Sequence, residues 1–445
     1  MADNSPVDIE QKLAEPKTYE DSILKIFGKK RLHGMAFGDA EDGVTYFSTA
    51  TGRRDLARAI ARTVATGQYK TQAVGLWILE TKGKRRAAHS PEYVDHVVGS
   101  ALAGLLTHNA QCYGMAGVYS YLPHVTNVGA ARGLAKCIRV HRKSVGPRGG
   151  PLYILQSDFE HYGDNLPVGP SAALWPILQS VAGLGSPTGS AGPNTLGLLT
   201  ALTRPVVRDS AGSEFNRLCG LPMGTPLVPI LSNLAVIPMD RAILDIDGIF
   251  YARYNDDFLF AHPDLDAMHE ADSRIDSLTA ELGVKRKMTK ERRTALSGNS
   301  QPSKHDPAYR GANRIDYLGL SITHAGTTAV APHRLRRFVA RIATRIDGMA
   351  AALHPLPIEQ RACHLVDATN VMLDLTNPFA VPGLPSLLDS TTDRGILKDV
   401  DFRIARKIVQ AATGWPGVQG FRELPPSRLF RDLNLTSLVR LKNLR

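Results

Sequence analysis

Cysteine is scarce and scattered in this 445-residue chain. The four cysteines are Cys112, Cys137, Cys219 and Cys363, and no two of them form a Cys-x-x-Cys pair. This spacing argues against a zinc knuckle, a disulfide framework and a haem attachment site. A chain with so few cysteines suits a reducing compartment, so we expect a cytoplasmic protein.

Long uninterrupted apolar runs are also lacking. The apolar segment 172–202 is broken by repeated glycine and proline, so it does not predict a membrane span. The N-terminus is polar and acidic and lacks the apolar core of a signal peptide. After residue 355 there is no pattern typical of an RNase H, HNH endonuclease or protease domain. We therefore expect a compact soluble protein with no membrane partner.

Acidic residues are fewer than basic ones, 42 against 53, which gives a formal net charge of +11. Such a balance is the electrostatic footprint of a nucleic-acid-binding protein, although many other soluble proteins share it. The distribution of the charge is more informative, because basic residues are concentrated in the segment 283–310. We therefore expect a polyanionic partner.

A helix with a basic face is predicted after Pro332. Apolar residues recur at helical spacing between Leu335 and Met349, and arginines follow the neighbouring face with a similar period. These arginines are Arg334, Arg337, Arg341 and Arg345. Such a helix would pack one face and offer the other to phosphates. The alternative is an ordinary solvated basic face.

Two adjacent carboxylates, Asp256 and Asp257, lie between two short runs of aromatic and aliphatic residues. The pattern of residues 251–261 predicts two strands, and Asn255-Asp256 predicts the tight turn that joins them. Such a hairpin would lift both acids out of a sheet and into a cleft. For an isolated pair of acids, a solvated hairpin tip is the simpler interpretation.

Residues upstream of the hairpin favour a catalytic site. An apolar run that begins at Gly150 predicts a buried strand that ends at Asp158. The segment 220–234 predicts a Gly- and Pro-containing loop followed by an apolar helix. Carboxylates are the ligands that Mg²⁺ prefers. Two divalent ions about 3.5–4 Å apart can stabilise both the attacking and the leaving oxygen of nucleotidyl transfer.

The order of these segments resembles the reverse transcriptases, specifically the bacterial branch that includes group II intron, retron and defence-associated enzymes. The resemblance covers residues 75–350 and rests on five motifs in the family's order. They are Asp158, the Gly-x-Pro-x-Gly segment 220–234, the Arg-Tyr-x-Asp-Asp box 253–257, the helix end and lysine at 282–290, and the aromatic-Leu-Gly hairpin 317–320. The basic element 82–86 and the segment 119–138 fit the family's fingers more loosely.

The resemblance implies an α+β fold, a right-hand polymerase with fingers, an antiparallel-sheet palm and a helical thumb. The expected N-terminal extension and start of the fingers occupy residues 1–66, and a basic amphipathic helix at 53–66 opens the fingers. The fingers and palm then occupy 67–325 and the thumb 326–380. A small, mostly helical C-terminal extension fills 381–445.

The same resemblance implies an RNA-directed DNA polymerase that makes cDNA with two Mg²⁺ ions, for which Mn²⁺ is an acceptable substitute. The expected partners are an RNA template, dNTPs and a DNA product, and a homo-oligomer is compatible with the chain. The family's defence-associated members suggest a dedicated non-coding RNA and a role in antiphage defence. The alternatives are an RNA polymerase or a template-independent nucleotidyltransferase on the same palm, and a catalytically idle RNA-binding scaffold.

Site residues follow from the resemblance position by position. Asp158, Asp256 and Asp257 are the implied catalytic metal ligands, with Phe159 beside them, and the backbone N–H groups after Asp158 are expected to receive triphosphate oxygens. The implied nucleotide-binding residues are Arg85, Arg86, Tyr162, Gly163, Met223, Gly224 and Lys290. For the cations in this set, the alternative is an ordinary exposed side chain. The implied nucleic-acid contacts are Tyr254, Leu318, Gly319, Arg334, Arg337, Arg341 and Arg345.

Three positions depart from the family pattern. Met223 stands where glutamine is usual, and Asn255 stands where Ala or Met is common. Gly163 stands where an aromatic residue usually blocks a ribose 2′-hydroxyl, with Tyr162 one place earlier. We expect Tyr162 to take over this sugar gate, and the alternative is a relaxed gate.

Overall fold

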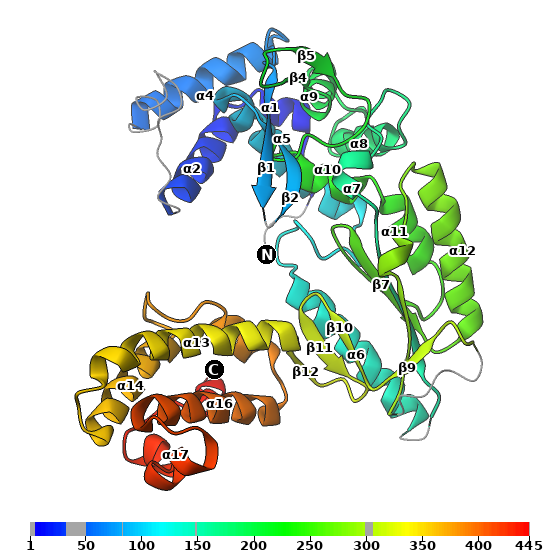
Figure 1. Ribbon diagram of the computed structural model, residues 1–445. Helices are drawn as coiled ribbons and strands as arrows, with labels where there is room; N and C mark the ends of the chain where they lie inside the picture. The colour runs from blue at the N-terminus through cyan, green and yellow to red at the C-terminus, as the bar shows by residue number, and fades with distance from the viewer. Residues whose placement is uncertain (1–4, 33–49, 82, 147–148, 299–305, 445) are drawn as a thin grey trace. The chain divides into compact units, whose positions relative to one another are not determined.

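The computed structural model describes residues 5–32, 50–81, 83–146, 149–298 and 306–444 (Figure 1). The chain divides into two compact units. The first comprises Met1–Thr126 and Ile154–Arg292, and the second comprises Asn127–Tyr153 and Arg293–Arg445. Both combine helices with antiparallel strands, which confirms the predicted α+β class. The predicted division into fingers, palm, thumb and C-terminal extension stays a prediction.

Helices dominate the N-terminal part of the first unit. They are α1 (Ile9–Leu13), α2 (Pro16–Leu32), α4 (Ala50–Ala65) and α5 (Tyr93–Tyr113). Helix α4 confirms the predicted basic amphipathic helix, because Ile60 and Val64 are buried one turn apart while Arg58 and Arg62 are exposed. Helices α2 and α4 pack on each other. None of the helices that the structure describes is both long enough and apolar enough to span a membrane.

A four-stranded sheet in the first unit has the order β2-β1-β4-β5 (Figure 1). Its strands are β1 (Val74–Thr81), β2 (Lys84–Ser90), β4 (Val206–Arg208) and β5 (Glu214–Asn216). Strands β1 and β2 form an antiparallel hairpin in which Glu80 lies opposite Arg85 and Leu79 opposite Arg86. Residue Lys82, part of the predicted basic element, lies outside the described residues.

The three acids Asp158, Asp256 and Asp257 lie on or beside neighbouring strands. The strands are β6 (Phe250–Tyr254), β7 (Asp257–His262) and β3 (Leu152–Asp158), in the order β6-β7-β3. Tyr254 pairs with Asp257, so Asn255 and Asp256 form the two-residue turn that the sequence predicts. Strand β3 is almost entirely buried, as predicted for the run that ends at Asp158. This arrangement brings the ends of β3 and of the β6–β7 hairpin together.

Helices connect and cover these strands in the first unit. They are α7 (Tyr162–Asn165), α8 (Leu174–Gly183), α9 (Pro193–Thr203), α10 (Val228–Leu234), α11 (Ile237–Leu244), α12 (Leu265–Glu281) and the 3₁₀ turn η1 (Met288–Lys290). Helix α11 packs on β6, and α12 packs on β7. The apolar helix predicted after the Gly- and Pro-containing loop is α10, and most of its residues are buried.

The second unit combines helix α6 (Asn127–Val145) with short strands. The strands are β8 (Arg292–Leu296), β9 (Arg310–Ala312), β10 (Arg314–Tyr317), β11 (Leu320–Thr323) and β12 (Thr328–Val330). Strands β10, β11 and β12 form an antiparallel sheet, and α6 packs on β11 (Figure 1). Strand β9 pairs in parallel with β8.

The chain is helical from Pro332 onward, as predicted. The helices are α13 (Pro332–Leu353), α14 (Ile358–Leu373), α15 (Leu384–Ser390), α16 (Arg394–Thr413), α17 (Gly417–Glu423), α18 (Pro426–Arg431) and α19 (Leu438–Asn443). Phe338, Ile342 and Ile346 form the buried face of α13. This face packs in the small bundle that α13 makes with α14 and α16.

Candidate active site

The turn that carries Asp256 has a left-handed backbone at Asn255, where φ is +59°. Asparagine adopts this region more readily than most residues that carry a side chain. The side-chain amide group of Asn255 also donates a hydrogen bond to the Asp256 carboxylate at 3.2 Å. Asparagine in place of the family's Ala or Met therefore suits the geometry of this turn.

Asp158 ends strand β3 and is 3% exposed. One of its carboxylate oxygens, Oδ2, forms an ion pair with the Lys290 ammonium group. Within the described part of the chain, the other oxygen, Oδ1, is buried without a hydrogen-bond partner. A buried acceptor without a partner is costly, and such groups often mark places where a ligand or ion completes the structure.

Asp257 belongs to the same electrostatic cluster, although its side chain is partly exposed to solvent. Partial desolvation of the carboxyl group, together with the negative charges of Asp256 and Asp158, raises the pKa of Asp257 to about 6. Lys290 opposes this rise. The three acids are thus close enough to repel one another, and a cation would relieve that repulsion.

The three carboxylates are chemically suited to a divalent cation, but they are not arranged as a metal site in this structure. In the described residue ranges, no three His, Cys, Asp or Glu side chains are already arranged to hold a metal ion. The chemistry nevertheless fits a hard cation, because Asp158 offers a carboxylate oxygen without a partner and all three donors are carboxylates. Lys290 supplies positive charge at Asp158 in this arrangement.

A cleft of about 710 Å³ opens beside Asp158 and Asp256. All the predicted nucleotide-binding residues except Gly224 line it, namely Arg85, Arg86, Tyr162, Gly163, Met223 and Lys290. Gly224 has φ +108°, and a Cβ atom there would lie 2.7 Å from the carbonyl oxygen of His89. Glycine at this position therefore lets the loop approach strand β2 closely.

Residues around the predicted sugar gate touch one another. The Tyr162 hydroxyl donates to the carbonyl of Ser232 at 2.5 Å, and its ring packs against Phe159 with centroids 5.1 Å apart. A Cβ atom on Gly163 would lie 2.7 Å from the sulfur of Met223. Two of the departures from the family pattern, Gly163 and Met223, therefore meet in space.

The first two backbone N–H groups after Asp158 have partners within the protein. The N–H group of Phe159 donates to the Asp256 carbonyl at 3.3 Å, and that of Glu160 donates to the Lys285 carbonyl at 2.7 Å. The backbone after Asp158 thus continues to pair with its neighbours beyond the strand. These two N–H groups are engaged in this arrangement, and the expectation that N–H groups after Asp158 receive triphosphate oxygens stays a prediction for the residues that follow them.

Arg253 is a residue whose burial and partners the sequence reasoning missed. It was matched only as the first letter of the Arg-Tyr-x-Asp-Asp box, yet its side chain is fully buried and pairs with Asp240 at 2.6 Å. A signal existed, since an arginine inside an apolar strand needs an acidic partner. Asp240, in the helix that precedes that strand, is one candidate.

The aromatic-Leu-Gly hairpin lies in the second unit. Leu318 has φ +48° and Gly319 has φ +84°, so both residues of the turn are left-handed, as a type I′ turn requires. A Cβ atom on Gly319 would lie 2.1 Å from the Arg334 guanidinium carbon. Glycine therefore allows both the turn and the close approach of the first arginine of α13.

The predicted basic face of α13 is present, and all four of its arginines are exposed. Two of them also donate to a neighbouring loop of the same unit, Arg341 to the Pro382 carbonyl at 3.1 Å and Arg345 to the Phe379 carbonyl at 2.9 Å. Their guanidinium groups are thus oriented but still reachable from solvent.

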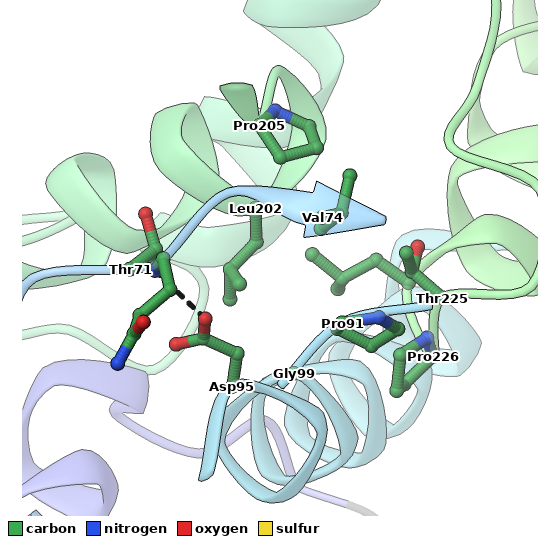
Figure 2. A pocket seen from close by; sticks show the side chains of 11 residues that line it. Thr71, Val74, Pro91, Asp95, Gly99, Leu202, Pro205, Thr225 and Pro226 are labelled. Atoms are coloured by element: carbon green, nitrogen blue, oxygen red, sulfur yellow. Dashed lines mark hydrogen bonds between the residues drawn. The ribbon is translucent and has the colours of Figure 1, made fainter. Parts of the chain in front are cut away.

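A second pocket in the first unit has a different character (Figure 2). Apolar residues and prolines line most of it, and Asp95 of α5 contributes a carboxylate. That carboxylate accepts hydrogen bonds from the Tyr69 hydroxyl at 2.5 Å and the Gln72 N–H at 2.8 Å. Burial raises the pKa of Asp95, and these hydrogen bonds oppose the rise. With its partners in place, Asp95 has the features of a structural acid.

Sequence comparison matches part of this site to a known family model. Residues 193–322 match the family model of reverse transcriptase (RNA-dependent DNA polymerase). The matched segment contains the loop 220–234, the acidic turn and Lys290, whereas Asp158 precedes it. The match supports an enzyme of the nucleotidyltransferase class. No curated protein matches the chain.

Similar solved structures are polymerases. Apo telomerase from Candida tropicalis, truncated from its C-terminal domain, has 13% identity and a TM-score of 0.44 over 58% of this chain and 55% of that chain. Telomerase from Candida albicans with a fragment of telomeric RNA has 12% identity and a TM-score of 0.43 over 84% and 67%. The RNA-dependent RNA polymerase of a human picobirnavirus has 12% identity and a TM-score of 0.41 over 84% and 65%. The chain thus spans about half the length of the first of these proteins.

Proposed function

We propose that this protein is an RNA-directed DNA polymerase and that the cleft of its first unit is the active site. One observation carries the proposal: Asp158 at the end of β3 and Asp256 in the β6–β7 turn line one cleft together with Arg85, Arg86 and Lys290. Nucleotidyl transfer needs clustered carboxylates and cations of this kind, because its substrate is a triphosphate and its product a pyrophosphate. The reverse transcriptase match over residues 193–322 supports the same activity.

In this proposal Asp158, Asp256 and Asp257 hold two Mg²⁺ ions, and Mn²⁺ can replace them. The bound ions would stabilise negative charge on the attacking 3′ oxygen and on the leaving pyrophosphate. Lys290 would exchange its contact with Asp158 for one with the pyrophosphate. Because a lysine ammonium is a flexible point charge on a long stem, this exchange needs little movement of the backbone.

The two arginines of strand β2 bind the triphosphate in this proposal. Arg85 and Arg86 lie on the same hairpin, and both line the cleft. Arginine binds phosphate oxygens in a bidentate geometry and stays charged. Met223 and Gly163 would lie beside the sugar and base, with Tyr162 behind them as the sugar gate.

The nucleic-acid contacts belong partly to the second unit. We assign the duplex backbone to the exposed arginines of α13 and the primer end to the turn of Leu318 and Gly319, with Tyr254 beside the acids. The template is an RNA, and the product is DNA. By resemblance to the defence-associated bacterial enzymes, we extend the proposal to a cytoplasmic antiphage role with a dedicated non-coding RNA.

The test is primer extension on an RNA template with dNTPs, with NTPs and without template. The proposal predicts template-dependent DNA synthesis that needs Mg²⁺ or Mn²⁺ and is lost in Asp256→Asn. An RNA polymerase is the second candidate, and the observation that favours it is the missing side chain at Gly163. Preferential incorporation of NTPs would establish that candidate, and extension without template would indicate a terminal nucleotidyltransferase. Duplex binding without incorporation of any nucleotide would indicate an idle scaffold.

A further inference from the structure

A buried arginine lies directly beneath the acidic turn. The Arg253 side chain is 0% exposed, and it donates to both carboxylate oxygens of Asp240, from Nε at 2.8 Å and from an Nη atom at 2.6 Å. The charge of Asp240 keeps the pKa of Arg253 above its ordinary value despite burial, so the guanidinium stays ionised. Tyr251 donates its hydroxyl to the same carboxylate at 2.6 Å.

The rest of the guanidinium reaches beyond this ion pair. One Nη atom donates to the Asn233 carbonyl at 3.0 Å, and the other donates to the carbonyl of Asn255 at 3.1 Å. Asn255 immediately precedes Asp256 in the turn. The guanidinium thus links α10 and α11 to the backbone that presents a proposed metal ligand.

Ser120 holds the same turn from the other side. Its buried hydroxyl accepts the N–H of Asn255 at 2.9 Å and donates to the side chain of Asn233 at 2.9 Å. Asn233 in turn donates to the Ser120 carbonyl at 2.7 Å. Both the N–H and the carbonyl of Asn255 are therefore fixed by groups from elsewhere in the first unit. This fixation offsets the cost of its left-handed backbone.

We propose that Arg253 and Ser120 are positioning residues that fix Asn255 and thereby aim the Asp256 carboxylate at the metal site. The inference rests on the proposed function, since it assigns these residues a role only if Asp256 binds the metal. Stability alone does not explain the ion pair, because an apolar pair of similar volume is often as stable as a buried ion pair. What an apolar pair cannot supply is a donor for the carbonyl of Asn255.

The experiment measures Mn²⁺ binding to the full chain by titration calorimetry, so that no turnover is required. Arg253→Lys keeps the charge but loses the forked geometry, and Ser120→Ala removes the hydrogen bond to the N–H of Asn255. Because substitutions of residues that orient metal ligands typically weaken metal affinity by about 10- to 100-fold, we expect a loss in that range for Arg253→Lys and a smaller one for Ser120→Ala. Tyr251→Phe is the matched control, since it removes a hydrogen bond to Asp240 and leaves the hydrogen bonds of Arg253 and Ser120 to Asn255 in place, and its affinity should stay within about twofold of the wild type.

The double variant Arg253→Met with Asp240→Leu separates positioning from folding. It replaces the ion pair with apolar side chains and leaves no uncompensated buried charge, so the melting temperature should fall less than in Arg253→Met alone, while Mn²⁺ affinity falls as in Arg253→Lys. If Arg253→Lys does not fold, the double variant and Ser120→Ala carry the test.

Wild-type Mn²⁺ affinity in a folded Arg253→Lys or double variant would overturn the inference, as would equal losses in Tyr251→Phe and Arg253→Lys. If Asp256→Asn binds Mn²⁺ as tightly as the wild type does, the proposed metal site would be overturned, and with it this inference. The two failures are therefore distinguishable.

Discussion

Two charged clusters of the first unit lie on either side of one turn and are built in opposite ways. Beneath the turn, the Arg253 guanidinium is matched by Asp240 and by two backbone carbonyls. In the cleft, one oxygen of Asp158 has no partner among the described residues, and partial desolvation together with the charges of Asp256 and Asp158 raises the pKa of Asp257. The first cluster has its donors and acceptors matched within the protein, whereas the second leaves a carboxylate oxygen without a partner among the described residues. Burial alone therefore does not separate a structural carboxylate from a proposed metal ligand, but the match between donors and acceptors does.

Asp95 sharpens this comparison. Burial raises the pKa of Asp95, as partial desolvation does for Asp257, but Asp95 accepts hydrogen bonds from Tyr69 and Gln72. Its pocket is lined mainly by apolar residues (Figure 2). A raised pKa is thus shared by a structural acid and a proposed metal ligand, and the partners of the carboxylate distinguish them.

The largest expected effect is at the cleft. Asp256→Ala should abolish nucleotide incorporation, a loss of at least about three orders of magnitude, because groups that stabilise transition-state charge contribute on this scale. Folding, measured by circular dichroism, and RNA binding should change little, since Asp256 lies in a turn and lines the cleft. Primer extension at a near-native rate by Asp256→Ala would contradict the two-metal assignment.

The next effect concerns the second unit. Replacing the arginines of the basic face, Arg334, Arg337, Arg341 and Arg345, with alanine should weaken duplex binding without changing sequence preference. The slope of log affinity against log salt should become shallower by about one for each phosphate that the variant no longer neutralises.

The matched control removes the same charge from exposed positions on α16 and α17. Its four substitutions to alanine are at Arg394, Arg403, Arg406 and Arg422, all of which are exposed. If both quadruple variants change the slope equally, α13 has no specific role in binding the duplex and its basic face is an ordinary solvated surface.

A third and smaller effect concerns sugar choice. Tyr162→Ala should raise ribonucleotide incorporation sharply if Tyr162 is the gate, whereas Tyr162→Phe, which loses only the hydroxyl bond to Ser232, should preserve selectivity. Gly163→Phe should block activity, because even a Cβ atom at this position would lie 2.7 Å from the Met223 sulfur. The measurement is the ratio of kcat/KM for dNTPs and NTPs. A preference for dNTPs that survives Tyr162→Ala would remove Tyr162 from this role.

Local patterns in the sequence predicted the elements that carry the acids. The hairpin of β6 and β7 follows from two apolar runs around Asn255-Asp256, and α13 follows from its helical period. The prediction that Asp158 and Asp256 lie in one cleft required the family's motif order, because the two residues are far apart along the chain. The cleft then confirmed that both acids lie together.

What the sequence could not predict depends on contacts between distant segments. The charge of Arg253 favours an exposed position, and only the packing of α11 against β6 supplies Asp240 as a partner. The N–H groups of Phe159 and Glu160 likewise pair with backbone from other segments of the chain, which no local pattern indicates. Similarly, Gly163 and Met223 depart from the family pattern at positions far apart in the sequence, and only the fold places them in contact.

The smallest effect is a stability difference that tests the cleft without any substrate. The folded-state pKa of Asp257 is about 6, above the usual value of 3.8, so the folded protein binds this proton more tightly than the unfolded chain does. The resulting stabilisation is present below pH 3.8 and is lost as the pH rises through 6. Asp257→Asn removes the ionised form, and it should therefore raise the melting temperature measured in EDTA at pH 8 by a few degrees at most, since solvent screens this partly exposed group. The increase should be smaller at pH 5, where the folded protein keeps most of this proton. An Asp257→Asn melting temperature that matches the wild type at pH 8, or an increase that is larger at pH 5, would show that the cleft does not disfavour the ionised form of Asp257. The two clusters beside the turn would then differ less than their partners indicate.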